Sequence, residues 1–520
     1  MDRRGFVAWS GAAILTSCSA APRAEVAPPA RPSLPTQPTE TSGRDPEPPT
    51  TAPTAAAAWS VDSPASAPFA NGVGSGDPGP DVVTLWTALV GDTEPVTSGD
   101  ALVSWEIALD PGFSAPIAQG AAQALRQDGH TLRVSVAGLP PDPLFYRFTW
   151  EGHRSPIGRT STAASSGTSI RLGVVSCQHF EEGTFAALGA LAQDEPDLVV
   201  HLGDYIYGRP GTPPLVRSQG MYDPGDLDDY RHLYRTYRRD PDLQLLHASA
   251  PVVAIWDDHE VAQNDAGTRS DRRRPDAYRA WWEQQASTIP PPDASGSLVM
   301  HRRLDLGELC RLWLLDGRQY RSTQVCRPGS LPPAADWCAD LEDPGRTMLG
   351  EAQERWLLEG VVDDGRWDIV AQPTVMADTS VTLGGTTAIN NDQWDGYPVA
   401  RRRVVAGMAA NPRSLVLSGD IHAAAAAEVR AGGVAIPEFV APSVTTRMDP
   451  TVALGLRLVL GASRGFSLFR PDIHGYLLVT IERDRVTARL RSVDAQRPGD
   501  EATDAATWTV HAGQSLPTID

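Results

Sequence analysis

The chain has 520 residues, of which 41% are hydrophobic and 21% are charged, and its formal net charge is −19 at pH 7. This length exceeds that of one average domain, and the composition allows a sizeable core. The acidic balance argues against a nucleic-acid-binding surface, which needs an excess of Lys and Arg. The sequence contains no Lys, which excludes a Walker A lysine, a Schiff-base lysine and a Ser-Lys dyad.

The amino terminus has the pattern of an export signal over residues 1–18. Arg3 and Arg4 precede a weakly apolar run that is too short to span a membrane. The start of the chain resembles a twin-arginine signal, and Leu15 to Cys18 resembles a bacterial lipobox. We therefore expect a cell-surface lipoprotein or an extracellular protein, with membrane contact only through a lipid on Cys18. The alternative is an ordinary signal peptide with a fortuitous Cys.

Two further segments precede the second half of the chain. Residues 19–65 are rich in Pro, Thr and Ala, which is typical of a disordered tether. Residues 66–163 contain short runs with period-two alternation, separated by turn residues. This pattern predicts an all-β domain, a sandwich of immunoglobulin or fibronectin type, and we find no catalytic cluster in it.

Residues 168–515 follow a different pattern, in which apolar strands alternate with helical stretches such as 184–193, 275–288 and 350–361. This alternation predicts a layered α/β domain with mixed sheets. Strands at 475–481 and 486–491 are expected to complete the sheets.

Polar residues follow the ends of four predicted strands. Ligands collect at the carboxyl ends of strands in open α/β sheets. Crowded carboxylates raise one another's pKa, and bound cations resolve that conflict. We therefore expect a trivalent or redox metal near the Cys and Tyr, and harder divalent ions near the carboxylates. The alternative is that each Asp caps the helix after it. The residues at the four strand ends are Cys177; Asp204 and Tyr207; Asp257, Asp258 and His259; and Asp420 and His422.

The remaining cysteines suit structural roles. Cys326 and Cys338 lie close together in a Pro-, Gly- and Asp-rich loop, and in an exported protein we expect them to form a disulfide. Cys310 lies in an apolar strand and is expected to be a buried thiol.

Several motifs together resemble the alkaline phosphatase D (PhoD-like) family, a branch of the metallophosphoesterases. They run in the family's order and cover about residues 69–491. The resemblance implies an N-terminal β-sandwich, an αββα-type metallophosphatase domain, twin-arginine export and a site with ferric iron and calcium. The motifs are residues 71–78, 85–87, 176–179, 201–207, 256–260, 316–321, 394–398 and 418–422.

By this resemblance, the family's ligand set can be carried over residue by residue. The iron (Fe3+) ligands would be Cys177, Asp204, Tyr207 and His422, with Asp204 bridging to calcium. The calcium (Ca2+) ligands would include Asp258 and Asp420. The identity of the divalent ion is left open.

The same resemblance implies hydrolysis of phosphomonoesters and phosphodiesters. Because Cys177 is expected to be a ligand and no other side chain is a good covalent nucleophile, we expect direct attack by a metal-bound hydroxide. His259 would lie on the leaving-group side. Arg318 is a candidate phosphate clamp, with a structural ion pair as its alternative. Gln372 stands where many metallophosphoesterases carry a His ligand. We expect a monomer whose partner is a phosphoester substrate.

Three rival functions have weaker support. Residues 461–465 match a serine-hydrolase nucleophile elbow, but no well-spaced Asp and His follow. Residues 259–263 fall one residue short of the zinc-protease motif, because position 263 is Gln. A non-enzymatic surface lipoprotein or adhesin would suit the tether and the sandwich, but it has no use for four converging ligand groups.

Overall fold

The structure, a computed structural model, describes residues 65–163, 167–264, 271–326, 335–383, 385–460 and 465–519. The expected signal at residues 1–18, the tether up to residue 64 and Ser463 of the nucleophile-elbow pattern lie outside these residues. Among the described residues, we find no helix with the length and apolar character that crossing a bilayer requires.

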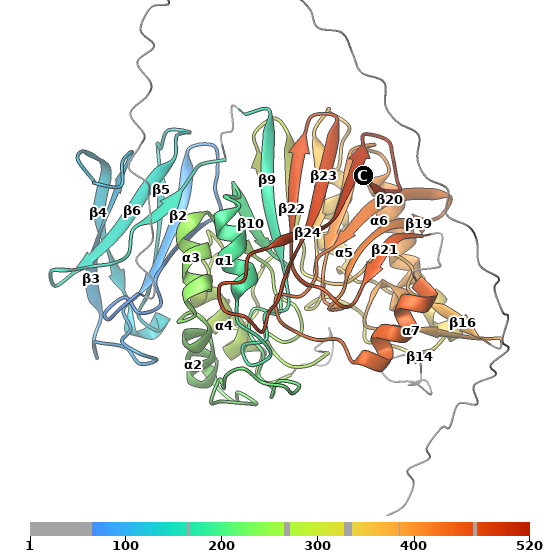
Figure 1. Cartoon of the computed structure of the whole chain (residues 1–520), viewed down its shortest axis with the longest axis horizontal. Helices are drawn as coiled ribbons and strands as arrows, with labels where there is room; N and C mark the ends of the chain where they lie inside the picture. The colour runs from blue at the N-terminus through green and yellow to red at the C-terminus, as the bar shows by residue number, and fades with distance from the viewer. Residues whose placement is uncertain are drawn as a thin grey trace, which may run out of the picture. The chain divides into compact units, whose positions relative to one another are not determined.

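One large sheet carries the first half of the site. Its seven strands run in the order β11-β10-β9-β22-β23-β24-β25, and several of them stand side by side in Figure 1. The three strands β9, β10 and β11 are parallel, whereas β22 pairs with β9 in antiparallel orientation. The strands are β9 (Ser169–Val175), β10 (Leu198–His201), β11 (Val252–Ala254), β22 (His474–Glu482), β23 (Arg485–Val493), β24 (Thr503–His511) and β25 (Thr518–Ile519).

A second large sheet carries the other half. Its strand order is β12-β13-β15-β18-β20-β19-β21, and β13, β15, β18 and β20 are parallel. The sheets are therefore mixed, as the sequence predicts. The strands are β12 (Arg302–Leu306), β13 (Cys310–Leu314), β15 (Trp367–Ala371), β18 (Ser414–Ser418), β19 (Ala424–Ala431), β20 (Val434–Val440) and β21 (Phe466–Arg470).

Alternation along the strands divides the core into layers. On β13, Leu312 and Leu314 join a core cluster shared with β9 and β22, while Trp313 joins a second cluster with α5 and α6. Successive side chains of a strand point to opposite faces, so one face of this sheet meets the other sheet and its other face meets helices. The helices are α1 (Ala186–Gln193), α2 (Leu227–Tyr237), α3 (Pro241–Ser249), α4 (Arg274–Gln284), α5 (Glu351–Gly360), α6 (Pro398–Met408) and α7 (Pro450–Leu460).

Local signals explain several helix boundaries. The Asp226 side chain accepts hydrogen bonds from the backbone N–H groups of Asp228 and Asp229 at the start of α2. Asp240 caps α3 in the same way, and Pro241 occupies its first turn. Both patterns satisfy N–H groups that a helix start leaves without partners.

The N-terminal part is all β, with two antiparallel sheets around a shared core that includes Val83, Ile107 and Phe148. Their assignment to the immunoglobulin or fibronectin type stays a prediction. Trp86 of this part donates a hydrogen bond to the backbone oxygen of Glu283 in α4. The strands are β1 (Val73–Gly76), β2 (Val82–Ala88), β3 (Ala101–Ala108), β4 (Pro116–Ala124), β5 (Thr131–Ala137), β6 (Leu144–Trp150), β7 (His153–Arg154) and β8 (Gly158–Thr160).

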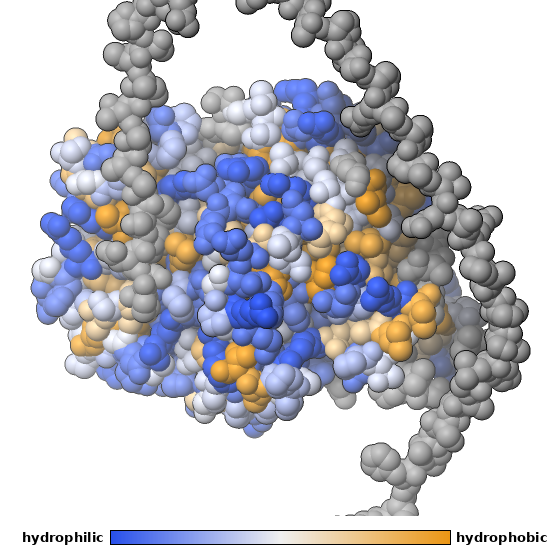
Figure 2. Space-filling model, in the orientation of Figure 1, coloured by the Kyte–Doolittle hydropathy of each residue, from blue (hydrophilic) through white to orange (hydrophobic). Residues whose placement is uncertain are grey.

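Peripheral features complete the fold. Cys326 and Cys338 form a disulfide, and Cys310 is a buried free thiol, so both cysteine predictions are confirmed. Helix α7 exposes Leu454 and Leu458, and Figure 2 shows an apolar patch over this helix. A small sheet contains β14 (Ala335–Asp336), β16 (Val381–Leu383) and β17 (Thr386–Ile389), and short 3-10 turns lie at Arg126–Asp128, Ala339–Glu342 and Trp394–Gly396.

Candidate metal centre

The residues that follow the parallel strands converge, and four of them adopt an unusual backbone conformation. Cys177, Asp204, Asp420 and His422 have φ values of 57°, 58°, 65° and 53°. Left-handed φ is uncommon outside glycine, and such residues cluster at functional sites where the surrounding structure holds them. The backbone therefore turns sharply at each of these strand ends and directs the side chains toward one region.

Gly203 is required for the turn before Asp204. Its φ is 109°, and a Cβ placed there would lie 2.6 Å from the backbone nitrogen of Asp257. Only glycine allows the loop after β10 to pass this close to the loop after β11.

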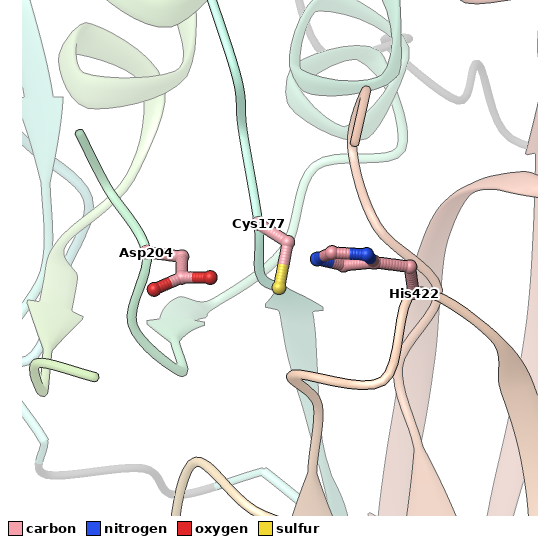
Figure 3. A group of neighbouring side chains, drawn as sticks. All are labelled: Cys177, Asp204 and His422. Carbon is pink, nitrogen blue, oxygen red and sulfur yellow. The ribbon is translucent and has the colours of Figure 1, made fainter. Parts of the chain in front are cut away.

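Three of the predicted ligands form a compact group from three separate segments. Cys177, Asp204 and His422 each offer one ligand atom, and these atoms lie within 4.8 Å of one another. Figure 3 shows the sulfur of Cys177 between the carboxylate of Asp204 and the ring of His422. The Tyr207 hydroxyl donates a 2.6 Å hydrogen bond to Oδ2 of Asp204, and it accepts one from Thr446 at 3.1 Å. Tyr207 therefore borders the same group.

Two more groups overlap with the first through Asp204. One contains Asp204, Asp258 and His259, and the other contains Asp204, Asp257, Asp258 and Asp420, again with ligand atoms within 4.8 Å. Asp204 belongs to all three. This arrangement suits two adjacent cations that share one carboxylate.

Electrostatics shows why these groups favour cations. Burial raises the pKa of Asp204 well above its usual range, and the neighbouring charge of Asp258 raises it further. Burial also raises the pKa of Asp257, although the charge of Arg318 opposes this, and Oδ2 of Asp257 has no hydrogen-bond partner among the described residues. Buried carboxylates held this close need positive charge nearby. The oxygen, imidazole and thiol donors therefore fit metal ions.

His259 is held beside these carboxylates. Its Nε2 lies 3.8 Å from Oδ2 of Asp258, and its ring centroid lies 4.3 Å from that of Tyr207. Burial lowers the pKa of His259 to about 4, although the charge of Asp258 opposes this. The imidazole is therefore neutral at pH 7 and can still donate one N–H.

Arg318 contacts carboxylates on three sides and is 1% exposed. Its Nη1 lies 2.9 Å from Asp392, its Nη2 lies 3.2 Å from Asp258, and its Nε donates to Asp257. These contacts match the structural ion pair that we gave as the alternative. The phosphate-clamp role stays a prediction.

Glu260, whose role the sequence does not reveal, holds two loops of the site together. Glu260 is fully buried, and its carboxylate accepts hydrogen bonds from the backbone N–H groups of Asp204 (3.1 Å), Tyr205 (2.7 Å) and Asp257 (2.8 Å). Burial raises its pKa to about 7, against the lowering effect of these bonds. Glu260 belongs to the motif at residues 256–260, but the motif assigns it no role.

A second missed element is the loop at residues 390–393. Asp392 pairs with Arg318 and Arg321, and Gln393 donates a hydrogen bond to Asp420. Gln372 lies inside the fold, where its Oε1 accepts a 3.1 Å hydrogen bond from Trp394, and it belongs to none of the three ligand groups. No local pattern in the sequence marks the loop as part of the site.

Comparison with known proteins identifies the family. Residues 172–490 match the family model described as PhoD-like phosphatase, and residues 54–164 match the one described as PhoD-like phosphatase, N-terminal domain. The chain belongs to the PhoD-like phosphatase family. The resemblance that the sequence motifs indicate is therefore confirmed.

Two PhoD relatives show how far the similarity extends. Alkaline phosphatase D of Bacillus subtilis (strain 168) is 32% identical over 416 residues, which cover 73% of this chain and 70% of that protein. A solved structure of PhoD matches with a TM-score of 0.80 at 29% identity, over 87% of this chain and 92% of that one. Membership of the PhoD-like family makes the chain a phosphoesterase hydrolase, so the non-enzymatic adhesin alternative is wrong. The family also implies dependence on metals.

Proposed function

We propose that this protein is an exported, metal-dependent phosphatase that hydrolyses phosphomonoesters and phosphodiesters at the strand-end site. The observation that carries the proposal is the sharing of Asp204 among three ligand groups, each with ligand atoms within 4.8 Å of one another. A carboxylate shared in this way suits a two-cation centre for phosphoryl transfer.

The donor types suggest which metal each half would hold. Ferric iron would be held by Cys177, Asp204, Tyr207 and His422, because thiolate and phenolate suit a redox or trivalent metal. Calcium would be held by Asp204, Asp258 and Asp420, whose hard oxygen donors suit it. When bound, such ions supply Lewis-acid polarisation of the phosphoryl group and lower the pKa of water.

The chain's own residues then have distinct roles. His259 holds a neutral imidazole whose N–H can donate to the leaving-group oxygen. Arg318 orients Asp257 and Asp258 through direct contacts. Glu260 fixes the backbone at Asp204 and Asp257 through hydrogen bonds to their N–H groups. In this scheme no side chain forms a covalent intermediate, because the thiol of Cys177 serves as a ligand.

Export and anchoring form part of the proposal. Twin-arginine export and a lipid on Cys18 would place the enzyme at the outer face of a membrane. Cys18→Ser should then release active enzyme from the membrane fraction into the medium. If all of the wild-type activity is already found in the medium, the lipobox interpretation is contradicted.

Metal analysis combined with activity assays tests the enzyme proposal. The purified chain should contain iron and a divalent ion, and it should lose hydrolysis of p-nitrophenyl phosphate and bis(p-nitrophenyl) phosphate after treatment with EDTA. Cys177→Ser should lose iron and activity. Cys310→Ser is the matched control, because Cys310 is also a buried free thiol but lies in β13, outside the three ligand groups.

Two outcomes would contradict the proposal. A metal-free preparation with full activity would remove the metal-dependent mechanism. Equal activity and equal iron content in Cys177→Ser and Cys310→Ser would remove Cys177 from the ligand set.

A further inference from the structure

Arg209 lies beside the candidate metal centre, two residues after Tyr207. Its Cζ lies 5.3 Å from the centroid of the Tyr207 ring, and that ring lies 4.3 Å from the ring of His259. The Arg209 side chain keeps 32% of its surface exposed, whereas Arg318 keeps 1%. Of these two arginines, Arg209 is the one that a ligand arriving from solvent can reach.

The backbone of Arg209 is firmly held. Its carbonyl oxygen lies 3.1 Å from Nε2 of His179, and it accepts a 3.3 Å hydrogen bond from Nε2 of Gln219. Two residues later, the N–H of Gly211 donates a 2.9 Å hydrogen bond to Glu181. The side chain therefore starts from a fixed point, which reduces the entropy lost when it binds a ligand.

The terminal nitrogens of the Arg209 guanidinium keep donors for a ligand. A guanidinium has five N–H donors. Nη1 of Arg209 donates to the carbonyl of Pro210 at 3.2 Å, which is the one guanidinium hydrogen bond found among the described residues, whereas Nε is buried without a partner and does not face solvent. Glu182 lies 3.9 Å from Nη1, beyond hydrogen-bond distance, and its carboxylate already accepts backbone N–H groups of Thr212 and Arg447.

The charge of Arg209 lies next to the site. Its guanidinium faces the ring of Tyr207, with 5.3 Å between Cζ and the ring centroid, and Tyr207 also contacts His259. The whole chain carries a net charge of −19, which repels anions at long range. A phosphate that approaches this site therefore needs a local cation, and Arg209 supplies one on the solvent side.

We propose that Arg209 binds the non-reacting oxygens of the substrate phosphoryl group and makes the site favour dianionic phosphomonoesters over monoanionic phosphodiesters. This inference rests on the proposed function. A guanidinium pairs with two phosphate oxygens at once. Above its second pKa of about 6, a monoester carries a second negative charge, and it has one more charged oxygen than a diester.

Substitution of Arg209 tests the inference with two esters and one inhibitor. In Arg209→Gln, we expect KM for p-nitrophenyl phosphate and Ki for inorganic phosphate each to rise about tenfold, as the loss of a charged hydrogen bond predicts. KM for bis(p-nitrophenyl) phosphate should rise less than threefold. Arg209→Lys keeps the charge without the planar fork, so it should recover part of both effects.

Arg239→Gln is the matched control for the change in charge. Arg239 is 47% exposed and pairs with Asp92 of the N-terminal part. This variant should match the wild type in KM and Ki for both esters and for phosphate. Thermal melts of all variants show whether each is folded.

The outcomes separate this inference from the proposed function. Unchanged KM and Ki in Arg209→Gln, or an equal increase in KM for both esters, would overturn the role of Arg209. The proposed function would still stand in that case if the wild-type activity is sensitive to EDTA. A wild type that hydrolyses neither ester would overturn both. A selective loss for the monoester that Arg209→Lys partly reverses would support the inference.

Discussion

Glu260→Gln should loosen the metal centre without touching any of the predicted ligands. In the folded protein, Oε2 accepts from the N–H groups of Asp204 and Asp257, and Oε1 accepts from Tyr205. A carboxamide has one oxygen, so its NH2 group must face at least one of these N–H donors. One charge-assisted hydrogen bond is lost, which is worth about 1.5–3 kcal/mol, and the other two become weaker neutral bonds. Relief from burying a charge offsets part of this, so we expect a loss of about 2–3 kcal/mol.

Urea unfolding at pH 9 measures this change in stability. Burial raises the pKa of Glu260 to about 7, so at pH 9 the wild-type side chain is ionised and the comparison is with a carboxylate. Retained metal after dialysis provides a second measurement, because the loops that carry Asp204 and Asp257 would no longer be held together. We expect both the free energy of unfolding and the metal content to fall.

Glu351→Gln is the control, since it makes the same substitution on the exposed face of α5. The Glu351 side chain is 90% exposed and pairs with Arg355, which is 59% exposed, so its loss should cost less than about 1 kcal/mol. If Glu260→Gln proves as stable as Glu351→Gln and keeps its metals, the reasoning about the three N–H groups is refuted.

Three further results are expected. Burial, assisted by the charge of Arg238, lowers the pKa of His201 to about 3. Its stabilising contribution is complete above the unfolded pKa of about 6.5 and is lost as pH falls toward 3, so His201 alone should account for a loss of about 2 kcal/mol between pH 7 and pH 5, and His201→Gln should show a correspondingly smaller total loss than the wild type in urea titrations. Reduction of the disulfide between Cys326 and Cys338, which closes a short loop, should lower the free energy of unfolding by about 2–3 kcal/mol, and unchanged urea midpoints with and without reductant would contradict this. Tyr207→Phe should shift or abolish a visible iron charge-transfer band. Tyr205→Phe should keep the band, because the Tyr205 hydroxyl forms its hydrogen bond with His247. Identical spectra for Tyr207→Phe and the wild type would refute the iron–phenolate assignment.

Residues tied to strand ends were predictable from the sequence. Cys177, Asp204 and Asp420 each follow an apolar run, and the carboxyl ends of parallel strands meet at one edge. Each strand end can be recognised from its own local pattern, so residues from segments that are far apart in the sequence could be assigned to one site. The mixed, sheet-rich architecture and the strands near 475–481 and 486–491 followed from the same kind of pattern.

Residues whose role depends on tertiary contacts were not predictable in this way. Glu260 acts through backbone N–H groups 55 and 56 residues earlier in the chain, and Asp392 acts through an arginine 74 residues earlier. Glu260 stands in the motif at residues 256–260, but the local sequence shows neither its contacts nor those of Asp392. Arg318 was found by its motif, but its surroundings of four carboxylates depend on how separate loops converge.

The pairing of β9 with β22 has a consequence for biosynthesis. Leu172 of β9 lies opposite Val479 of β22, so the strand that leads to Cys177 has its neighbour on one side more than 300 residues later. A nascent chain that has emerged only as far as His422 contains every predicted ligand, yet β9 still lacks this partner and remains an exposed sheet edge. Assembly of the centre should therefore be post-translational, and a truncation before β22 should yield an aggregating chain although it removes none of those ligands.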